Sequence, residues 1–120
     1  MNKILIAGDR PEIGTLFELL LWQADRQFLH TKKLAACLDM ALRTKPDLIV
    51  VESQKENLQD VYNVLVSLKG SSETYKTPVV LTLDEGMLEA GKGEFAGLVE
   101  DVISEPFKPL EVKTLTEKYL

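Results

Sequence analysis

The sequence predicts an α/β fold in which five parallel strands form one sheet with helices on both faces. Short apolar runs typical of buried parallel strands alternate with segments whose apolar residues recur every three or four positions, as in amphipathic helices. Such strand-helix-strand units have right-handed crossovers. At 120 residues we expect a single domain over 1–120. Its predicted architecture is a flavodoxin-like (β/α)5 three-layer sandwich with the strand order 2-1-3-4-5.

The first half of the chain contains three predicted strands and two predicted helices. The strands are 3–7 (KILIA), 27–31 (QFLHT) and 47–52 (DLIVVE). The first helix starts at Pro11, because proline is favoured at the first helical position. The second helix ends at Lys45, before Pro46. The expected inward residues are Ile13, Leu16, Phe17, Leu20, Leu21 and Ala24 in the first helix and Leu34, Leu38, Ala41 and Leu42 in the second.

The second half adds two strands, two helices and a weaker helical segment. Strands are expected at 78–83 (PVVLTL) and 101–104 (DVIS). The third helix closes at Gly70 and the last one opens at Pro109. Their inward residues are Val61, Val64, Leu65 and Leu68, and Val112, Leu115 and Tyr119. Segment 84–100 contains Gly86, Gly91, Gly93 and Gly97. Each interior glycine costs a helix about 1 kcal/mol relative to alanine, so this fourth helix should be short, frayed or displaced.

Composition narrows the function classes. The net charge is −5 and there is no block of Lys or Arg, which argues against nucleic acid or an anionic membrane as a direct partner. The apolar runs are too short for a membrane span and the start does not resemble a cleavable signal, so we expect a cytoplasmic protein. Cys37, the only cysteine, should pack in the core, and His30, the only histidine, should lie on a strand surface.

Functional residues of open parallel sheets lie beyond the carboxyl ends of the strands. In this chain those positions are Gly8 and Asp9 after the first strand, Glu52 at the end of the third, Leu83 and Asp84 after the fourth, and Glu105 after the fifth. Glu52 is the unusual one, because a continuous apolar run leads straight into a carboxylate, and burying a charge is costly.

Four segments together resemble the receiver domain of bacterial two-component response regulators. They are KILIAGDRPEI (3–13), KPDLIVVE (45–52), TPVVLTL (77–83) and DVISEPFKP (101–109), and the resemblance covers essentially the whole chain. The specific features are the KPDL lead-in to the third strand, TPV before the fourth, and the Pro-Phe pair after the fifth. The resemblance implies a role in signal transduction and phosphorelay.

The same resemblance implies where a phosphorylation pocket would lie. Receivers use two acids after the first strand to hold Mg²⁺, an aspartate ending the third strand as phosphoryl acceptor, a Thr or Ser after the fourth and a Lys after the fifth. The corresponding residues here are Gly8 and Asp9, Glu52, Leu83 and Glu105. Only Asp9 is retained, and the aromatic residue usual in the fifth strand is replaced by Val102.

Each departure has a physical cost. Glu52 is longer than aspartate by one methylene, about 1.5 Å, and a misplacement of about 1 Å can cost a hundredfold in rate. Gly8 removes a carboxylate from a metal site that demands near-ideal geometry. Leu83 offers no hydroxyl, and Glu105 replaces a stabilising positive charge by a negative one. We therefore expect a degenerate pseudo-receiver without a phosphorylation cycle, catalytic residues or a bound cofactor.

The remaining acids allow several interpretations. Asp9, Glu52 and Glu105 could converge, and then either one keeps a proton through mutual repulsion or all three form a weak Mg²⁺ or Ca²⁺ site. The simpler expectation is that Glu52 and Glu105 point toward water. A third interpretation is that Glu52 imitates a phosphorylated aspartate, although no Lys or Thr is there to respond. The resemblance also implies a cis Glu105-Pro106 bond, a minority state for X-Pro.

Two surfaces are candidates for binding a partner. Leu19 and Trp22 lie off the inward stripe of the first helix, and exposed large apolar residues indicate a contact site. The alternative is that Trp22 packs against Phe28 or the following loop. The second surface comprises the fourth helix, the fifth strand with Val102, and the last helix, which receivers commonly use for dimerisation and output, so a homodimer is also considered.

The sequence favours a phosphorylation-independent protein-interaction module in bacterial signalling, and not an enzyme. The alternative is an atypical receiver phosphorylated on Glu52 or Asp9. A lesser alternative is a small-molecule- or cation-binding flavodoxin-like domain. Residues 9–14 (DRPEIG) are similar to the Asp-x-His-x-x-Gly loop of cobalamin-binding domains, but Pro11 stands at the His position. The GDRPE segment is also unlike a flavin phosphate loop.

Overall fold

The computed structural model describes residues 2–87 and 93–120 of the chain. These residues form a five-stranded parallel sheet in the order β2-β1-β3-β4-β5, as predicted. The strands are β1 (Asn2–Ala7), β2 (Arg26–Thr31), β3 (Leu48–Glu52), β4 (Val79–Leu83) and β5 (Asp101–Ser104). Every predicted strand boundary is correct to within one residue.

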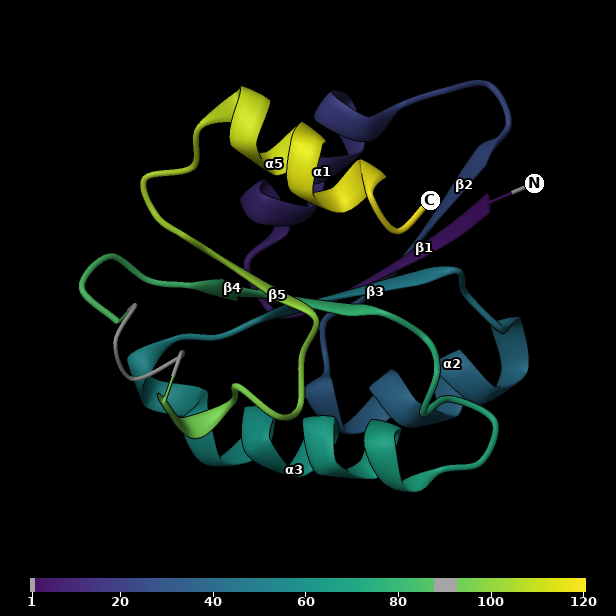
Figure 1. The fold of residues 1–120 in the computed structure, drawn as a ribbon, viewed down its shortest axis with the longest axis vertical. Helices are drawn as coiled ribbons and strands as arrows, with labels where there is room; N and C mark the ends of the chain where they lie inside the picture. The colour runs from purple at the N-terminus through teal and green to yellow at the C-terminus, as the bar shows by residue number, and fades with distance from the viewer. Residues whose placement is uncertain (1, 88–92) are drawn as a thin grey trace.

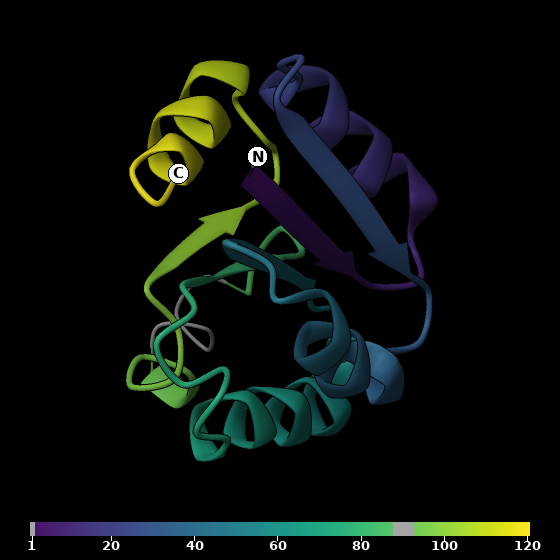
Figure 2. The same cartoon turned by 90° about the vertical axis from the view of Figure 1, so that its right-hand side faces the viewer.

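Helices cover both faces of the sheet. Helices α1 (Pro11–Leu21) and α5 (Pro109–Glu117) lie on one face, and α2 (Cys37–Thr44) and α3 (Leu58–Gly70) lie on the other (Figure 1). The view turned by 90° shows the same three layers, with the sheet between the two helical pairs (Figure 2). None of the helices in the described ranges is long and apolar enough to cross a membrane.

The two faces of the sheet carry separate apolar clusters, because successive residues of a strand point to opposite faces. On β1, Leu5 and Ala7 belong to the cluster under α2 and α3, whereas Ile4 and Ile6 belong to the cluster under α1 and α5. All residues of β3 and β4 are buried, as expected for central parallel strands. Burial therefore extends to the last residue of β3, which is Glu52.

Helix α1 is shorter than predicted. It ends at Leu21, so Ala24, which was expected on the inward stripe, lies beyond the helix and is exposed. The chain leaves the helix at Trp22, whose ψ of 129° is not helical. Arg26 Nη1 donates a hydrogen bond of 2.8 Å to the Leu21 carbonyl oxygen and so satisfies an acceptor that the helix end leaves free.

The second predicted helix is divided. It begins with a 3-10 turn at Leu34–Ala36 and continues as α2 from Cys37. It ends where predicted, because Lys45 adopts a left-handed conformation with φ of 52° and its amide donates to the Ala41 carbonyl oxygen. The core of the predicted weak fourth helix, residues 88–92, lies outside the described residues. On either side of it, Met87 and Phe95 are buried.

The two residues that were expected to be structural have ordinary surroundings. Cys37 is completely buried, and burial raises the pKa of its thiol to about 12, which makes it inert. His30 is exposed on β2, with its Nε2 atom 3.2 Å from Glu18 Oε2. The Glu105-Pro106 peptide bond is cis, as the resemblance implied.

Candidate functional site

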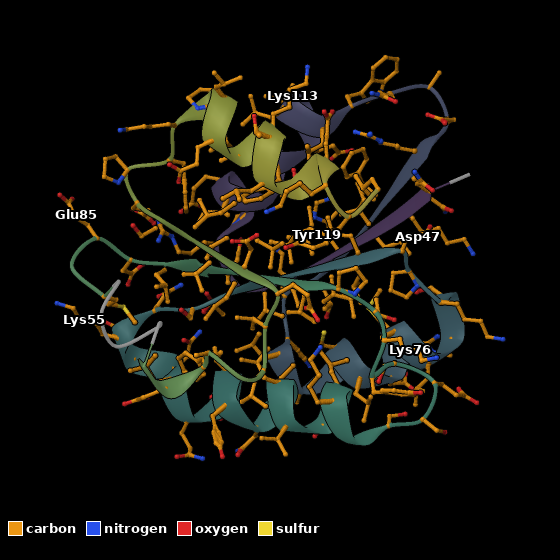
Figure 3. The ribbon with its side chains drawn as sticks, viewed as in Figure 1. Asp47, Lys55, Lys76, Glu85, Lys113 and Tyr119 are labelled. Carbon is orange, nitrogen blue, oxygen red and sulfur yellow. The ribbon has the colours of Figure 1, made fainter. Side chains whose placement is uncertain are left out.

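The carboxyl ends of four strands meet at one edge of the sheet. The strand register pairs Ala7 with Val51, Glu52 with Thr82, and Leu83 with Ser104. The sequence-predicted positions that directly follow or end these strands are therefore neighbours. Figure 3 shows this edge from the side, with Lys55 and Glu85 at it and Asp47 and Lys76 at the opposite edge.

Glu52 fits at the end of β3 because Gly8 has no side chain. The Glu52 residue is only 2% exposed. A Cβ atom added at Gly8 would lie 1.8 Å from Glu52 Oε2 and 2.4 Å from its Cδ, far inside van der Waals contact. The longer acid at position 52 thus occupies the space that a side chain at position 8 would need. The two departures from the receiver pattern are parts of one packing arrangement.

Burial determines the protonation of Glu52. The loss of water raises the pKa of its carboxyl to about 7 from an ordinary value of 4.5. The Arg10 backbone amide, which donates to Oε2 at 3.2 Å, and the Arg10 charge oppose this rise, while Asp9 and Glu12 add to it slightly. The expectation that Glu52 points toward water was wrong. The interpretation that one acid keeps a proton agrees with this raised pKa, but desolvation is the main cause, and not repulsion between acids.

Arg10 supplies the positive charge that the sequence appeared to lack. Its Nη1 atom lies 2.9 Å from Asp84 Oδ1 and 2.5 Å from Glu105 Oε1, and its Nε atom lies 3.1 Å from Glu12 Oε1. We call Arg10 with Glu12, Asp84 and Glu105 the Arg10 clasp. The clasp connects the loop after β1, where Arg10 lies, with the segments that follow β4 and β5.

Sequence reasoning missed Arg10, because no receiver role is assigned to that position. A charge count could have indicated it. Asp9, Glu52, Asp84 and Glu105 all follow strands at one edge, and Arg10 is the only basic residue directly beside them in sequence. Several acids held close together require a cation, a proton or exposure to water. All three occur in the structure. Arg10 is the cation that pairs with Asp84 and Glu105. Glu52 has a raised pKa, which favours its protonated form, and Asp9 is exposed to water.

Asp9 is directed away from the other acids. Its Oδ1 atom accepts a hydrogen bond of 2.8 Å from Gln54 Nε2, in the loop after β3. Glu105 is instead engaged with Arg10. Asp9, Glu52 and Glu105 therefore do not point at a common centre. Within residues 2–87 and 93–120, no three His, Cys, Asp or Glu side chains are grouped to hold a metal ion.

Leu83 stands where receivers have a Thr or Ser, and it offers no hydroxyl group. Leu83 is 1% exposed and packs in the core under α3. Nearby, the Ser53 hydroxyl donates a 2.8 Å hydrogen bond to the Thr82 carbonyl oxygen. That hydroxyl is buried and occupied in holding β3 to β4, so it does not replace the one that receivers place after the fourth strand.

Comparison with known proteins identifies the fold. CheY4 of Vibrio cholerae, a chemotaxis response regulator, superposes with a TM-score of 0.83 at 16% identity, covering 100% of this chain and 99% of that one. The signal receiver domain of a histidine kinase from Syntrophus aciditrophicus gives 0.83 at 22% identity, covering 100% and 90%. The fold is that of receiver domains. No family model matches the sequence, and no curated protein matches it.

Receiver chemistry uses Mg²⁺, and the residues of this receiver fold do not fit such a site. The receiver domain of the sensor histidine kinase PA1611 from Pseudomonas aeruginosa has a magnesium ion in its active-site cleft; it matches with a TM-score of 0.81 at 18% identity, covering 98% of this chain and 96% of that one. Here Gly8 provides no ligand, Glu52 is buried, and a guanidinium already pairs with Asp84 and Glu105. A cation placed beside Arg10 would be repelled.

The candidate binding surface on α1 is exposed. Leu19 is 74% exposed and Trp22 is 66% exposed, so the alternative that Trp22 packs down on Phe28 is wrong. On the second candidate surface, Val102 is half-buried and lines a hollow beside α5 together with Leu110 and Leu115. The roles of Leu19, Trp22 and Val102 in binding stay predictions.

Proposed function

We propose that this chain is a degenerate receiver domain that acts in bacterial signal transduction as a phosphorylation-independent protein-interaction module, without catalysis and without a bound cofactor. The observation that carries the proposal is the Arg10 clasp beside a buried Glu52. The positive charge at this site belongs to a side chain of the protein, Arg10, and the carboxyl group at the acceptor position, Glu52, is buried.

A phosphoryl group has no place to bind in this arrangement. Transfer to a carboxylate depends on positioning the acceptor in line and on cations that neutralise the phosphoryl oxygens. Glu52 is 2% exposed and its carboxyl group fills the space over Gly8. A phosphoryl group attached there would add negative charge near Asp84 and Glu105, which already share the single positive charge of Arg10 with Glu12. The added negative charge would find a glutamate, and not a lysine, at position 105.

The first test is phosphorylation by acetyl phosphate and Mg²⁺, followed by intact-mass measurement. We expect no mass increase for the wild-type chain, and a functional receiver treated in parallel provides the positive control. A stable phosphorylated species would contradict the proposal. Mapping the modified residue would then decide whether the acceptor is Glu52 or the exposed Asp9, which is the alternative function of an atypical receiver.

The surface on α1 is the proposed contact for a protein partner. Leu19, on α1, and Trp22, where the chain leaves that helix, are both exposed and lie three positions apart in sequence. Large apolar side chains exposed near one another indicate a contact site, and tryptophan is enriched among residues that dominate binding energy. The partner is expected to present an apolar patch to this face.

The second test compares partner recovery from lysate by wild type and by Trp22→Ala. We expect Trp22→Ala to lower the affinity for the recovered protein at least about tenfold, because a dominant tryptophan contributes about 2 kcal/mol or more. Lys113→Ala, an exposed change on α5, is the matched control and should leave recovery unchanged. Equal recovery with Trp22→Ala and loss with Lys113→Ala would move the binding surface to α5.

A further inference from the structure

Arg10 makes two different connections that meet at Glu52. Its backbone amide donates to Glu52 Oε2 at 3.2 Å. Its guanidinium holds Asp84 and Glu105, in the segments after β4 and β5. A change in the charge of Glu52 therefore acts directly on Arg10, the residue that holds the clasp together.

The groups that face Glu52 come from several elements. Asp9 and Arg10 belong to the loop after β1, and Glu12 belongs to α1. A hollow of about 270 Å³ next to Glu52 is also lined by Glu18 of α1, His30 of β2 and Lys32 in the following loop. Asp84 and Glu105 contact the Arg10 guanidinium. Among the described residues, Arg10 is the cation whose charge opposes the rise in the pKa of Glu52.

An ionised Glu52 cannot keep the arrangement seen here without cost. A buried carboxylate with a single hydrogen-bond donor lacks the partners that a buried charge requires. The Arg10 residue lines the same hollow as Glu52, and its guanidinium is held by three other carboxylates. Moving the guanidinium toward Glu52 weakens its contacts with Asp84 and Glu105.

We propose that Glu52 is a proton-dependent control on the Arg10 clasp: when Glu52 is neutral the clasp is closed on Asp84 and Glu105, and when Glu52 loses its proton the guanidinium is drawn from them and the segments after β4 and β5 are released. This inference rests on the proposed function, because it assigns Glu52 a regulatory role in place of phosphoryl acceptance. The raised pKa of Glu52, about 7, supports it by placing the transition near neutral pH.

The test is an NMR titration of the folded chain between about pH 5.5 and pH 8.5, with ¹³C-labelled glutamate carboxyls and ¹⁵N-labelled arginine side chains. We expect the Glu52 carboxyl resonance to titrate with a midpoint near 7 and the Arg10 Nε resonance to shift with the same midpoint. Glu52→Gln, a neutral isostere, should fix Arg10 in its low-pH position at every pH.

His30 is the one histidine of the sequence and lines the same hollow as Glu52, so His30→Gln is the control. This variant should keep the Arg10 shift. An Arg10 resonance that stays constant while Glu52 titrates, or that shifts equally in Glu52→Gln, would overturn the inference, as would loss of the shift in His30→Gln. If Glu52→Gln does not fold, the His30→Gln variant still tests the inference. In that variant the Glu52 carboxyl and the Arg10 Nε resonance should titrate with the same midpoint, and different midpoints would overturn the inference. A phosphorylated species by mass would refute the proposed function independently of this result.

Discussion

At the scale of single residues, the site is organised by the pairing of Gly8 with Glu52. Separately, a missing acid at position 8 and a lengthened acid at position 52 look like two losses. Together they are complementary, because the Glu52 carboxyl group occupies the place that any Cβ at position 8 would take. Restoring only one of the receiver residues should therefore harm the fold and restore nothing.

The substitution Gly8→Asp tests this packing. We expect it to lower the free energy of unfolding by about 1–3 kcal/mol, the usual cost of forcing extra atoms into a packed site. Combining it with Glu52→Asp should recover much of the loss, because the shorter acid vacates the space. Urea denaturation measures both. Gly97→Asp is the control, since a Cβ at Gly97 meets nothing within 4 Å, and an equal loss there would contradict the packing explanation.

The pH dependence of stability tests the protonation of Glu52. Its pKa is about 7 in the fold and about 4.5 when unfolded, so between these values the folded chain binds more protons than the unfolded chain. Stability therefore falls as pH rises from about 4.5 to about 7, by about 3 kcal/mol from this group, and its contribution is constant above that range. Glu52→Gln should abolish this component. A wild-type-minus-variant difference in unfolding free energy that is flat with pH would contradict the assignment.

At the scale of elements, the Arg10 clasp connects three separate segments of the chain. The start of α1 and the segments after β4 and β5 are held by one guanidinium. Arg10, Asp84 and Glu105 are 29%, 26% and 27% exposed, so solvent screens their pairs only partly, whereas Glu12 is 65% exposed and its pair with Arg10 is screened more strongly.

Removing Arg10 should loosen these segments selectively. In Arg10→Ala we expect faster hydrogen exchange at the amides of Met87 and Glu105, which donate to Asp84 and Leu83 carbonyl oxygens next to the clasp. Arg43→Ala is the control, because the Arg43–Asp39 pair lies on the exposed surface of α2. Unchanged protection at Glu105 in Arg10→Ala would show that the clasp holds nothing.

The α1 surface makes an equally direct prediction about stability. Trp22→Ala should change the free energy of unfolding by no more than about 0.5 kcal/mol, because Trp22 is 66% exposed. Leu21→Ala, one residue earlier and 1% exposed, should cost about 2–5 kcal/mol. Thermal or urea unfolding separates the two. A large loss for Trp22→Ala would indicate a structural role and remove the argument for a binding surface.

The positions of the strands and helices could be predicted from the sequence, whereas the conformation of Glu52 could not. Strand and helix positions were predictable because they follow from hydrophobic period and from Pro11, Pro46 and Pro109. The order of the strands and the edge at which Glu52 meets its neighbours followed from the same pattern. The conformation of Glu52 was not predictable, because it depends on the space that Gly8, which has no side chain, leaves at the end of the neighbouring strand β1.

Arg10 illustrates the same limit on sequence reasoning. Its neighbours Asp84 and Glu105 are distant in sequence, and only the folded chain shows which acids the guanidinium reaches. The end of α1 was predicted too late, because Ala24 continued the apolar period while Arg26, five residues after Leu21, closes the helix end. Local periodicity does not report such long-range hydrogen bonds.

At the scale of the whole molecule, the chain has the receiver fold, and the proposed difference from receivers lies in the side chains at the carboxyl ends of the strands. The sheet order, both helical layers and the cis Glu105-Pro106 bond agree with receivers. At the carboxyl edge, an internal guanidinium and a buried carboxyl group stand where receivers bind a metal and a phosphoryl group. The proposed outcome is a domain that binds partners without being phosphorylated.

The most direct measurement is a crystal structure of the chain soaked with beryllofluoride and Mg²⁺, a mimic of the phosphorylated receiver. The account predicts no beryllofluoride on Glu52, no Mg²⁺ beside Asp9, and Arg10 still paired with Asp84 and Glu105. Beryllofluoride bonded to the Glu52 carboxylate, with Mg²⁺ coordinated next to it, would contradict the account.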